Sequence, residues 1–253
     1  MDLMRRDFIF DVGIVSEDFD NAIDLIAHSL ENGLPFTLVF LNSNLLDYYY
    51  NRKLDLDLKN ENVFIFPDGI FLDLCNILFN GKRFKANLNG TDVCPKVLDL
   101  LDPEASVSIV GGDSDLHNLV RQRLSGSYDV NLGCLYSGFF RNEQEKHAVI
   151  NDIIEKNVEV IFVAMGNPLQ ENFVQELRDA GFQGAAICVG AFFNFFVGLE
   201  KRAPRILRIV RMEWFYRFVN SPRRLFKRYF LAGPRLFLLV VIYNLRSRFR
   251  LSD

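Results

Sequence analysis

Six short apolar runs, separated by longer stretches of helical character, most constrain how this chain can fold. Most of the runs are continuous in Val, Ile, Leu and Phe, without polar alternation, which is typical of strands covered on both faces. Their alternation with helical stretches predicts an α/β fold with a mostly parallel, doubly wound sheet. We expect strands at residues 36–41, 63–66, 107–110, 128–132, 158–164 and 185–189, and helices at 18–31, 70–79, 92–101, 114–124, 143–156 and 168–180.

Charge divides the chain into two parts. Residues 201–253 hold 14 Lys and Arg against two acidic residues, whereas residues 1–200 hold 15 basic and 30 acidic residues. The net charges are +12 and −15, which predicts an anionic partner for the tail. The sequence 201–204 (KRAP) is a natural boundary, so we expect an α/β domain at 1–199 and a basic, aromatic helical appendage at 200–253.

Several classes of protein are excluded by composition. At 49% hydrophobic and 24% charged residues, the chain is not intrinsically disordered. Its four cysteines and three histidines are scattered, so we expect no disulfide framework, no metal and a reducing cytoplasm. The first 13 residues carry acids where the apolar region of a signal peptide would lie, and no apolar run reaches the roughly 20 residues of a membrane-spanning helix.

Small and polar residues follow the predicted strands at their carboxyl ends, where open α/β sheets bind ligands. Asp68 lies in a Pro-Asp-Gly turn and could act as a general base on a hydroxyl, although the tripeptide also suits a plain turn or a helix cap. Gly111 and Gly112 would let backbone N–H groups approach a phosphate, and a tight strand-to-helix turn explains them equally well. The G-x-G-x-x-G and P-loop fingerprints are missing from the sequence, which argues against a dehydrogenase or a P-loop kinase.

The segment 167–170 (NPLQ) follows the fifth strand. Asn167 suits a helix N-cap with Pro168 at the first helical position. Gln170 is not needed for a cap, and its amide could hydrogen-bond a sugar hydroxyl or a base edge.

The basic tail has several interpretations, with Pro222 and Pro234 expected to divide it into three helices. Its Arg and aromatic residues suit nucleic acid, the anionic inner leaflet of a membrane, or a pyrophosphate-bearing ligand. A helical hairpin whose aromatics pack on the domain is the purely structural alternative. The acidic body argues against nucleic acid, and Arg205, Arg208 and Arg211 are spaced to lie near one another along one helix.

The order of motifs along the chain resembles the WecG/TagA/CpsF family of bacterial glycosyltransferases. The matching segments are 67–70 (PDGI), 89–92 (NGTD), 110–112 (VGG), 138–140 (GFF), 164–171 (AMGNPLQE), 189–193 (VGAFF), 201–204 (KRAP), 213–217 (EWFYR) and 222–225 (PRRL). Each motif is weak alone, but the set in this order is specific.

The resemblance implies a Rossmann-like core and an inverting, metal-independent transfer of a sugar from a UDP-sugar to an undecaprenyl-pyrophosphate-linked sugar. It implies no cofactor, and a peripheral location on the inner face of the bacterial cytoplasmic membrane, in cell-surface polysaccharide biosynthesis. A homo-oligomer is one alternative for the quaternary structure. A non-catalytic module that binds a nucleotide or an anionic lipid within a polysaccharide assembly complex is the alternative function.

Site residues also follow from the resemblance. Asp68 corresponds to the proposed catalytic base. The residues that correspond to the sugar and acceptor pocket are Asn42, Thr91, Asp92, Gly111, Gly112, Asn167, Gln170 and Gly190. Those expected at a diphosphate are Arg217, Arg224 and Lys227, while Arg246, Arg248 and Arg250 would serve the membrane.

Two positions depart from the family pattern. Phe40 stands where many members have Thr, and Asn87 stands where many have Arg. The Asn-Leu-Asn-Gly-Thr-Asp version resembles an exopolysaccharide subgroup that includes the GumM-type glucosyltransferases. We therefore expect a donor other than UDP-N-acetylmannosamine, with UDP-glucose or a related hexose preferred.

Overall fold

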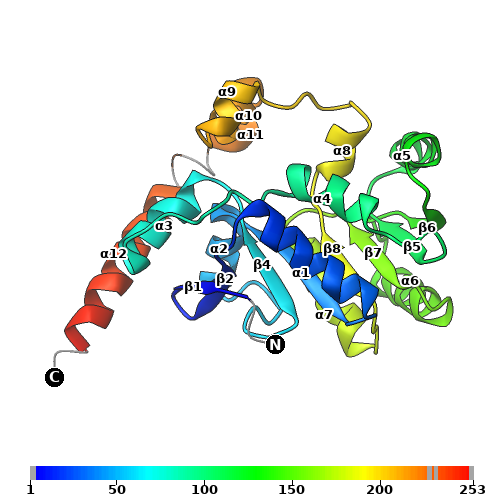
Figure 1. Ribbon diagram of the computed structural model, residues 1–253, viewed down its shortest axis with the longest axis horizontal. Helices are drawn as coiled ribbons and strands as arrows, with labels where there is room; N and C mark the ends of the chain where they lie inside the picture. The colour runs from blue at the N-terminus through cyan, green and yellow to red at the C-terminus, as the bar shows by residue number, and fades with distance from the viewer. Residues whose placement is uncertain (1–3, 227–229, 231–232, 251–253) are drawn as a thin grey trace.

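The computed structural model describes residues 4–226, 230 and 233–250 of the chain (Figure 1). Its centre is a six-stranded, wholly parallel sheet in the order β4-β3-β8-β7-β5-β6, which confirms the predicted α/β fold. The strands are β3 (Phe36–Leu41), β4 (Val63–Pro67), β5 (Ser106–Val110), β6 (Asn131–Tyr136), β7 (Val160–Val163) and β8 (Ala185–Cys188).

Helices cover both faces of this sheet. One face packs against α1 (Phe19–Glu31), α4 (Gly90–Asp99), α5 (Ser114–Ser127) and α8 (Phe192–Phe196). The other packs against α2 (Ser43–Tyr50), α3 (Ile70–Asn80), α6 (Glu143–Glu155) and α7 (Leu169–Asp179). In β3, Phe36, Leu38 and Phe40 enter the first core, and Val39 and Leu41 enter the second. Burial on both faces explains why the run carries no polar alternation.

The prediction for the strand that became β6 is wrong. A strand was expected at residues 128–132, but α5 continues to Ser127 and the N–H of Tyr128 donates to Leu124 O at 2.8 Å, closing the helix. The Tyr128 ring then packs beside Phe196, with ring centroids 5.8 Å apart. The strand begins three residues later, at Asn131, as an edge strand that is half-exposed.

An N-terminal hairpin, β1 (Arg6–Ile9) with β2 (Val12–Val15), was not predicted, and neither were the short helices α2 and α8. The hairpin is anchored by the buried carboxylate of Asp7, which accepts from Ser16 Oγ at 2.6 Å and from Asn76 Nδ2 of α3 at 3.0 Å. Lys82 adds an ion pair at 2.8 Å. These contacts fix α3 and therefore the turn that precedes it.

The described residues of the basic tail form four helices, rather than three: α9 (Arg205–Ile209), α10 (Glu213–Asn220), α11 (Pro222–Phe226) and α12 (Gly233–Arg250). The additional break lies at Arg211, whose φ of 57° is left-handed, so Arg205, Arg208 and Arg211 do not share one helix. Figure 1 shows α9, α10 and α11 grouped beyond the end of the sheet where α4 and α8 lie, while α12 runs along α3.

Part of the tail is a packing element. Leu236 and Val240 of α12 are fully buried in the core on the α3 side of the sheet. Tyr243 packs edge-on against Phe10 of the hairpin, with centroids 4.8 Å apart, and Asn244 Nδ2 donates to Leu78 O at 3.2 Å. The structural alternative for the tail therefore holds for α12.

Arg211 ties the remainder of the tail to the domain. Its guanidinium pairs with the carboxylate of Asp73, a residue of α3 that is only 1% exposed, and also donates to Phe84 O at 3.5 Å. The second oxygen of Asp73 has no hydrogen-bond partner in the described part of the chain. The guanidinium thus compensates a carboxylate that is otherwise poorly satisfied.

Replacing Arg211 with Ala should leave that buried carboxylate uncompensated, so the free energy of unfolding should fall by about 3 kcal/mol. Urea denaturation measures the change. Arg205→Ala, on the exposed side of α9, is the matched control and should alter the free energy by less than about 0.5 kcal/mol. Adding Asp73→Asn to Arg211→Ala should restore part of the loss. An Arg211→Ala effect no larger than the control would contradict this assignment.

Candidate active site

The carboxyl ends of the parallel strands bring the predicted site residues to one edge of the sheet. In spatial order along that edge stand Asp68 after β4, Asn42 after β3, Gly190 after β8, the loop 164–168 after β7, and Gly111 after β5. Neighbouring strands lie about 5 Å apart, so the five positions span about 20 Å along the edge. The structure thus brings together residues that are far apart in the sequence.

Asp68 is half-buried directly beyond β4, and its N–H donates to Leu41 O of β3 at 2.8 Å. The next residue, Gly69, has a φ of 95° and is the N-cap of α3. Asp68 therefore does not occupy the capping position, and the cap alternative for this aspartate is wrong. This backbone pairing places Asp68 at the edge of the sheet, where a carboxylate is suited to general-base chemistry.

Asn87, one of the two departures from the family pattern, supports the same turn. Its Oδ1 accepts from the N–H of Gly69 at 2.7 Å, across 18 residues of sequence. Phe40, the other departure, is 6% exposed, and its ring lies 3.1 Å from the position a Cβ on Gly90 would take. The two positions thus provide a brace for the Asp68 turn and an apolar floor under the first residue of α4.

Asn42 has a structural role that the sequence did not indicate. Its Oδ1 accepts from the N–H groups of Asn44 and Leu45, at 3.0 and 3.2 Å, and so caps α2. The cap fixes Asn42 at the edge between Asp68 and Gly190.

Close backbone approach explains the glycines after β5. A Cβ on Gly111 would lie 2.4 Å from Ala164 O, and the φ of Gly111 is 129°, so this position accepts only glycine. His117 Nε2 lies 2.8 Å from Gly111 O and donates to it. A Cβ on Gly112 would meet Leu116 at 2.5 Å. The tight-turn alternative is therefore sufficient for both glycines, and their phosphate contact stays a prediction.

The loop after β7 differs from the predicted cap. Helix α7 begins at Leu169 with Pro168 as its N-cap, and the side chain of Asn167 instead donates to Glu171 Oε1 at 2.6 Å. Gln170 is 3% exposed, and its Oε1 accepts from the N–H groups of Gly166 at 3.1 Å and Gly190 at 2.9 Å. Gln170 therefore joins the ends of β7 and β8, and the backbone N–H of Gly190 is directed at Gln170.

Thr91 and Asp92 lie half-buried in the first turn of α4. Asp92 pairs with Arg202 at 2.7 Å and accepts from Asn89 Nδ2 at 2.7 Å. Burial by itself would raise the pKa of Asp92, but the hydrogen bonds from Arg202 and Asn89 hold that pKa below its usual range. Arg202 also lies 3.4 Å from Glu213 of α10, so Asp92 connects the domain to the tail.

Arg217 is the one predicted phosphate-binding residue whose side chain the structure describes. Its guanidinium lies over the Phe195 ring of α8, 5.3 Å from the centroid, and 3.9 Å from Glu213. The side chain is 44% exposed, so it sits beside the sheet edge with access to solvent. The side chain of Arg224 and the whole of Lys227 lie outside the described residues.

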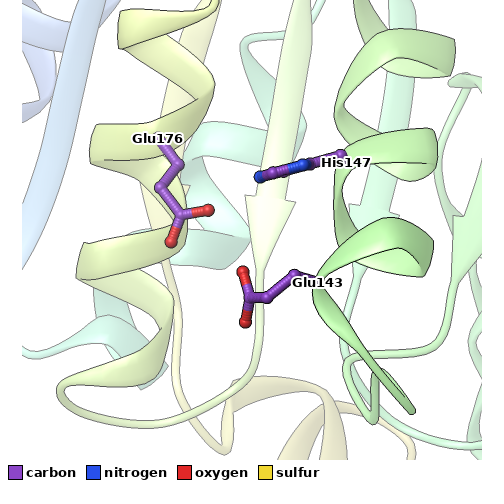
Figure 2. Close-up of side chains that lie close together, drawn as sticks. All are labelled: Glu143, His147 and Glu176. Carbon is purple, nitrogen blue, oxygen red and sulfur yellow. The ribbon is translucent and has the colours of Figure 1, made fainter.

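Metal-ligand geometry arises at a site that the sequence did not indicate. Figure 2 shows Glu143 and His147 of α6 pointing toward Glu176 of α7. The potential ligand atoms of these three residues lie within 4.8 Å of one another. Lys146, however, pairs with Glu143 and with Glu176, each at 2.7 Å. Its ammonium already compensates both carboxylates, so we assign the cluster to helix–helix ion pairing.

Sequence reasoning missed Asn87, Arg202, His117 and Glu171 as supporting residues. Asn87 and Arg202 act across 18 and 110 positions of sequence, on Gly69 and Asp92. A local pattern carries no signal for such pairs. Glu171 stands inside the motif 164–171, but only its burial in the structure distinguishes it from an ordinary first-turn glutamate.

Comparison with known proteins identifies the family of this chain. The glycosyl transferase WecG/TagA/CpsF family matches residues 8–250. A relative from Bacillus subtilis (strain 168), N-acetylglucosaminyldiphosphoundecaprenol N-acetyl-beta-D-mannosaminyltransferase, is 26% identical over 224 residues, which is 87% of this chain and 86% of that protein. Within the described residues, no helix combines the length and apolar character needed to span a bilayer. The family match over nearly the whole chain shows that this chain belongs to the WecG/TagA/CpsF family of glycosyltransferases.

Proposed function

We propose that this chain transfers a sugar from a UDP-sugar to a sugar linked to undecaprenyl diphosphate, in cell-surface polysaccharide biosynthesis. The observation that carries the proposal is the row of family motifs along the carboxyl edge, with Asp68 at one end and the basic tail beside it. The Bacillus relative is named for a lipid-diphosphate-linked acceptor, which supports the acceptor class.

The reaction we propose is a single inverting displacement. The Asp68 carboxylate takes the proton of the acceptor hydroxyl while that oxygen attacks the anomeric carbon. The bond from the anomeric carbon to the diphosphate breaks, its electron pair leaves with UDP, and the new glycosidic bond forms on the opposite face of the ring. We propose that no metal takes part, so that Arg217, together with Arg224 and Lys227, stabilises the leaving diphosphate.

The donor sugar is proposed to differ from N-acetylmannosamine. Phe40 places a ring beneath Gly90 where many family members have the hydroxyl of Thr. Asn87 accepts a hydrogen bond from the N–H of Gly69 where many have the guanidinium of Arg. We therefore propose UDP-glucose or a related hexose donor. A donor screen with a short-chain prenyl-diphosphate sugar, analysed by mass spectrometry, tests this choice, and exclusive use of UDP-N-acetylmannosamine would overturn it.

The tail is proposed to place the site at the inner surface of the cytoplasmic membrane. Helix α9 exposes Arg205 together with Ile206 and Ile209, the last two at 76% and 70%. Helix α10 exposes Phe215 at 44%. Apolar side chains next to arginines suit an anionic lipid surface, where each cation contributes about 1 kcal/mol.

Asp68→Asn should lower sugar transfer at least about 100-fold, because the amide cannot take the hydroxyl proton. UDP release with a prenyl-diphosphate sugar acceptor measures the rate, and circular dichroism confirms folding. Asp102→Asn, an exposed residue before β5 at the opposite edge, is the matched control and should keep the wild-type rate. Near-normal turnover by the Asp68 variant would refute the base assignment. UDP binding without turnover in the wild type would favour a non-catalytic module.

Ile206→Glu combined with Ile209→Glu should weaken binding to vesicles that contain anionic lipid, because the variant loses apolar contact and gains negative charge. Co-sedimentation measures the bound fraction. Leu119→Glu on α5, also partly exposed, should leave binding unchanged. Equal binding by the double variant and the wild type would exclude α9 from the membrane contact.

A further inference from the structure

Glu171 is a buried acid that the proposed chemistry does not use. It lies in the first turn of α7 with 0% exposure, and its Oε1 accepts from Asn167 Nδ2 at 2.6 Å and Gln170 Nε2 at 2.7 Å. Its Oε2 is buried and has no hydrogen-bond partner among the described residues. A carboxyl group in such a place is costly to bury, so its presence calls for a role beyond packing.

The contacts of Gln170 show what that role is. The Gln170 amide has two different ends, and the backbone N–H groups of Gly166 and Gly190 require the oxygen end. Glu171 receives the nitrogen end, which fixes the amide in that orientation. Without the acceptor at Glu171, the Gln170 amide can rotate by half a turn. Its NH₂ group would then face the backbone N–H groups of Gly166 and Gly190, and no hydrogen bond could form. The orientation of one amide therefore decides whether the ends of β7 and β8 are joined.

We propose that Glu171 is a positioning residue for the transfer reaction, which through Gln170 and Asn167 fixes the loops ending β7 and β8 around the bound nucleotide sugar. This inference rests on the proposed function for its effect on turnover. Glu171 is fully buried, so it touches neither substrate and acts only through these two amides.

The form of Glu171 that fits this geometry is the neutral one. An ionised carboxylate would leave a charged Oε2 without a donor in a site closed to water. Burial raises the pKa of Glu171 to about 7, although the hydrogen bonds from Gln170 and Asn167 act in the opposite direction. The neutral acid is therefore the main species below neutral pH, and the ionised form gains above it.

No ionisable group described on the neighbouring elements compensates a negative charge on Glu171. Cys188 on β8 faces Glu171, and burial raises the pKa of its thiol well above the usual value, so it stays neutral. Arg178, farther along α7, donates to Phe182 O, and Lys146 of α6 pairs with Glu176. The loop before β4 brings Asp55 and Asp57 to α7, where their backbone N–H groups donate to Asn172 and Gln175.

The sign of the pH effect follows from the raised pKa. Between pH 4.5, the ordinary pKa of a glutamate, and about pH 7, the folded state holds a proton on Glu171, whereas the unfolded chain releases it. Stability from this group is present below that window and is lost as the pH rises through it. We expect the loops to loosen over the same range.

The experiment compares kcat/KM for wild type and Glu171→Gln from about pH 6 to about pH 8. Glutamine keeps an acceptor oxygen for the two amides but cannot ionise, and every other residue of the two proteins is the same. The ratio of wild type to variant should therefore fall about tenfold across this range, as a group of pKa about 7 requires. A ratio independent of pH would overturn the proposal, since a merely structural role changes the ratio by the same factor at every pH.

A second measurement does not depend on turnover or on any variant. Amide hydrogen exchange of the wild-type protein should show that the N–H groups of Gly166 and Gly190 lose protection above about pH 7, after correction for intrinsic exchange. Peptides from α1 serve as the control and should keep their protection from exchange over the same pH range. Unchanged protection at both glycines would overturn the proposal. If protection changes as expected but no UDP-sugar is turned over, the proposed function fails and the positioning contact stands.

Discussion

A parallel sheet buried on both faces can present chemistry only at its ends, and this constraint organises the whole molecule. The strands β3, β4, β7 and β8 bury all of their residues, so their faces have no room for a ligand. Their backbone groups pair with one another, so a ligand can be contacted only by residues beyond the last residue of each strand. Asp68, Asn42, Gly166 and Gly190 all stand just beyond these strands, which places the candidate site at this edge.

The division of charge has a mechanical role as well as a chemical one. The acidic domain and the basic tail meet through named pairs: Arg202 with Asp92 at 2.7 Å, and Arg211 with the buried carboxylate of Asp73. Both arginines are thereby committed to positioning the tail. Others, such as Arg217 at the edge and Arg205 on α9, keep solvent access and suit the diphosphate and lipid contacts proposed for the tail. A count of cations alone could not separate these two groups.

Support for the site comes from side-chain amides more than from charges. Asn42 caps α2, Asn87 holds the N–H of Gly69, and Gln170 joins the ends of β7 and β8. An amide can satisfy a backbone N–H at a fixed distance without adding charge to the site. This explains why residues expected to contact the sugar also serve the backbone, and why Glu171 can control two loops through one amide.

The sequence by itself determined the α/β class, the position of most strands and helices, and the edge at which the site lies, because hydrophobic periodicity and turn residues are local properties of the chain. It placed Asp68 and Gln170 at that edge for the same reason. The tertiary structure alone decided the start of β6, the N-terminal hairpin, the break at Arg211, and the partners of Asp92, Gly69 and Glu171. Those features depend on contacts between residues distant in sequence and on burial, which sets the free energy of a charge or a hydrogen bond only after the chain has folded.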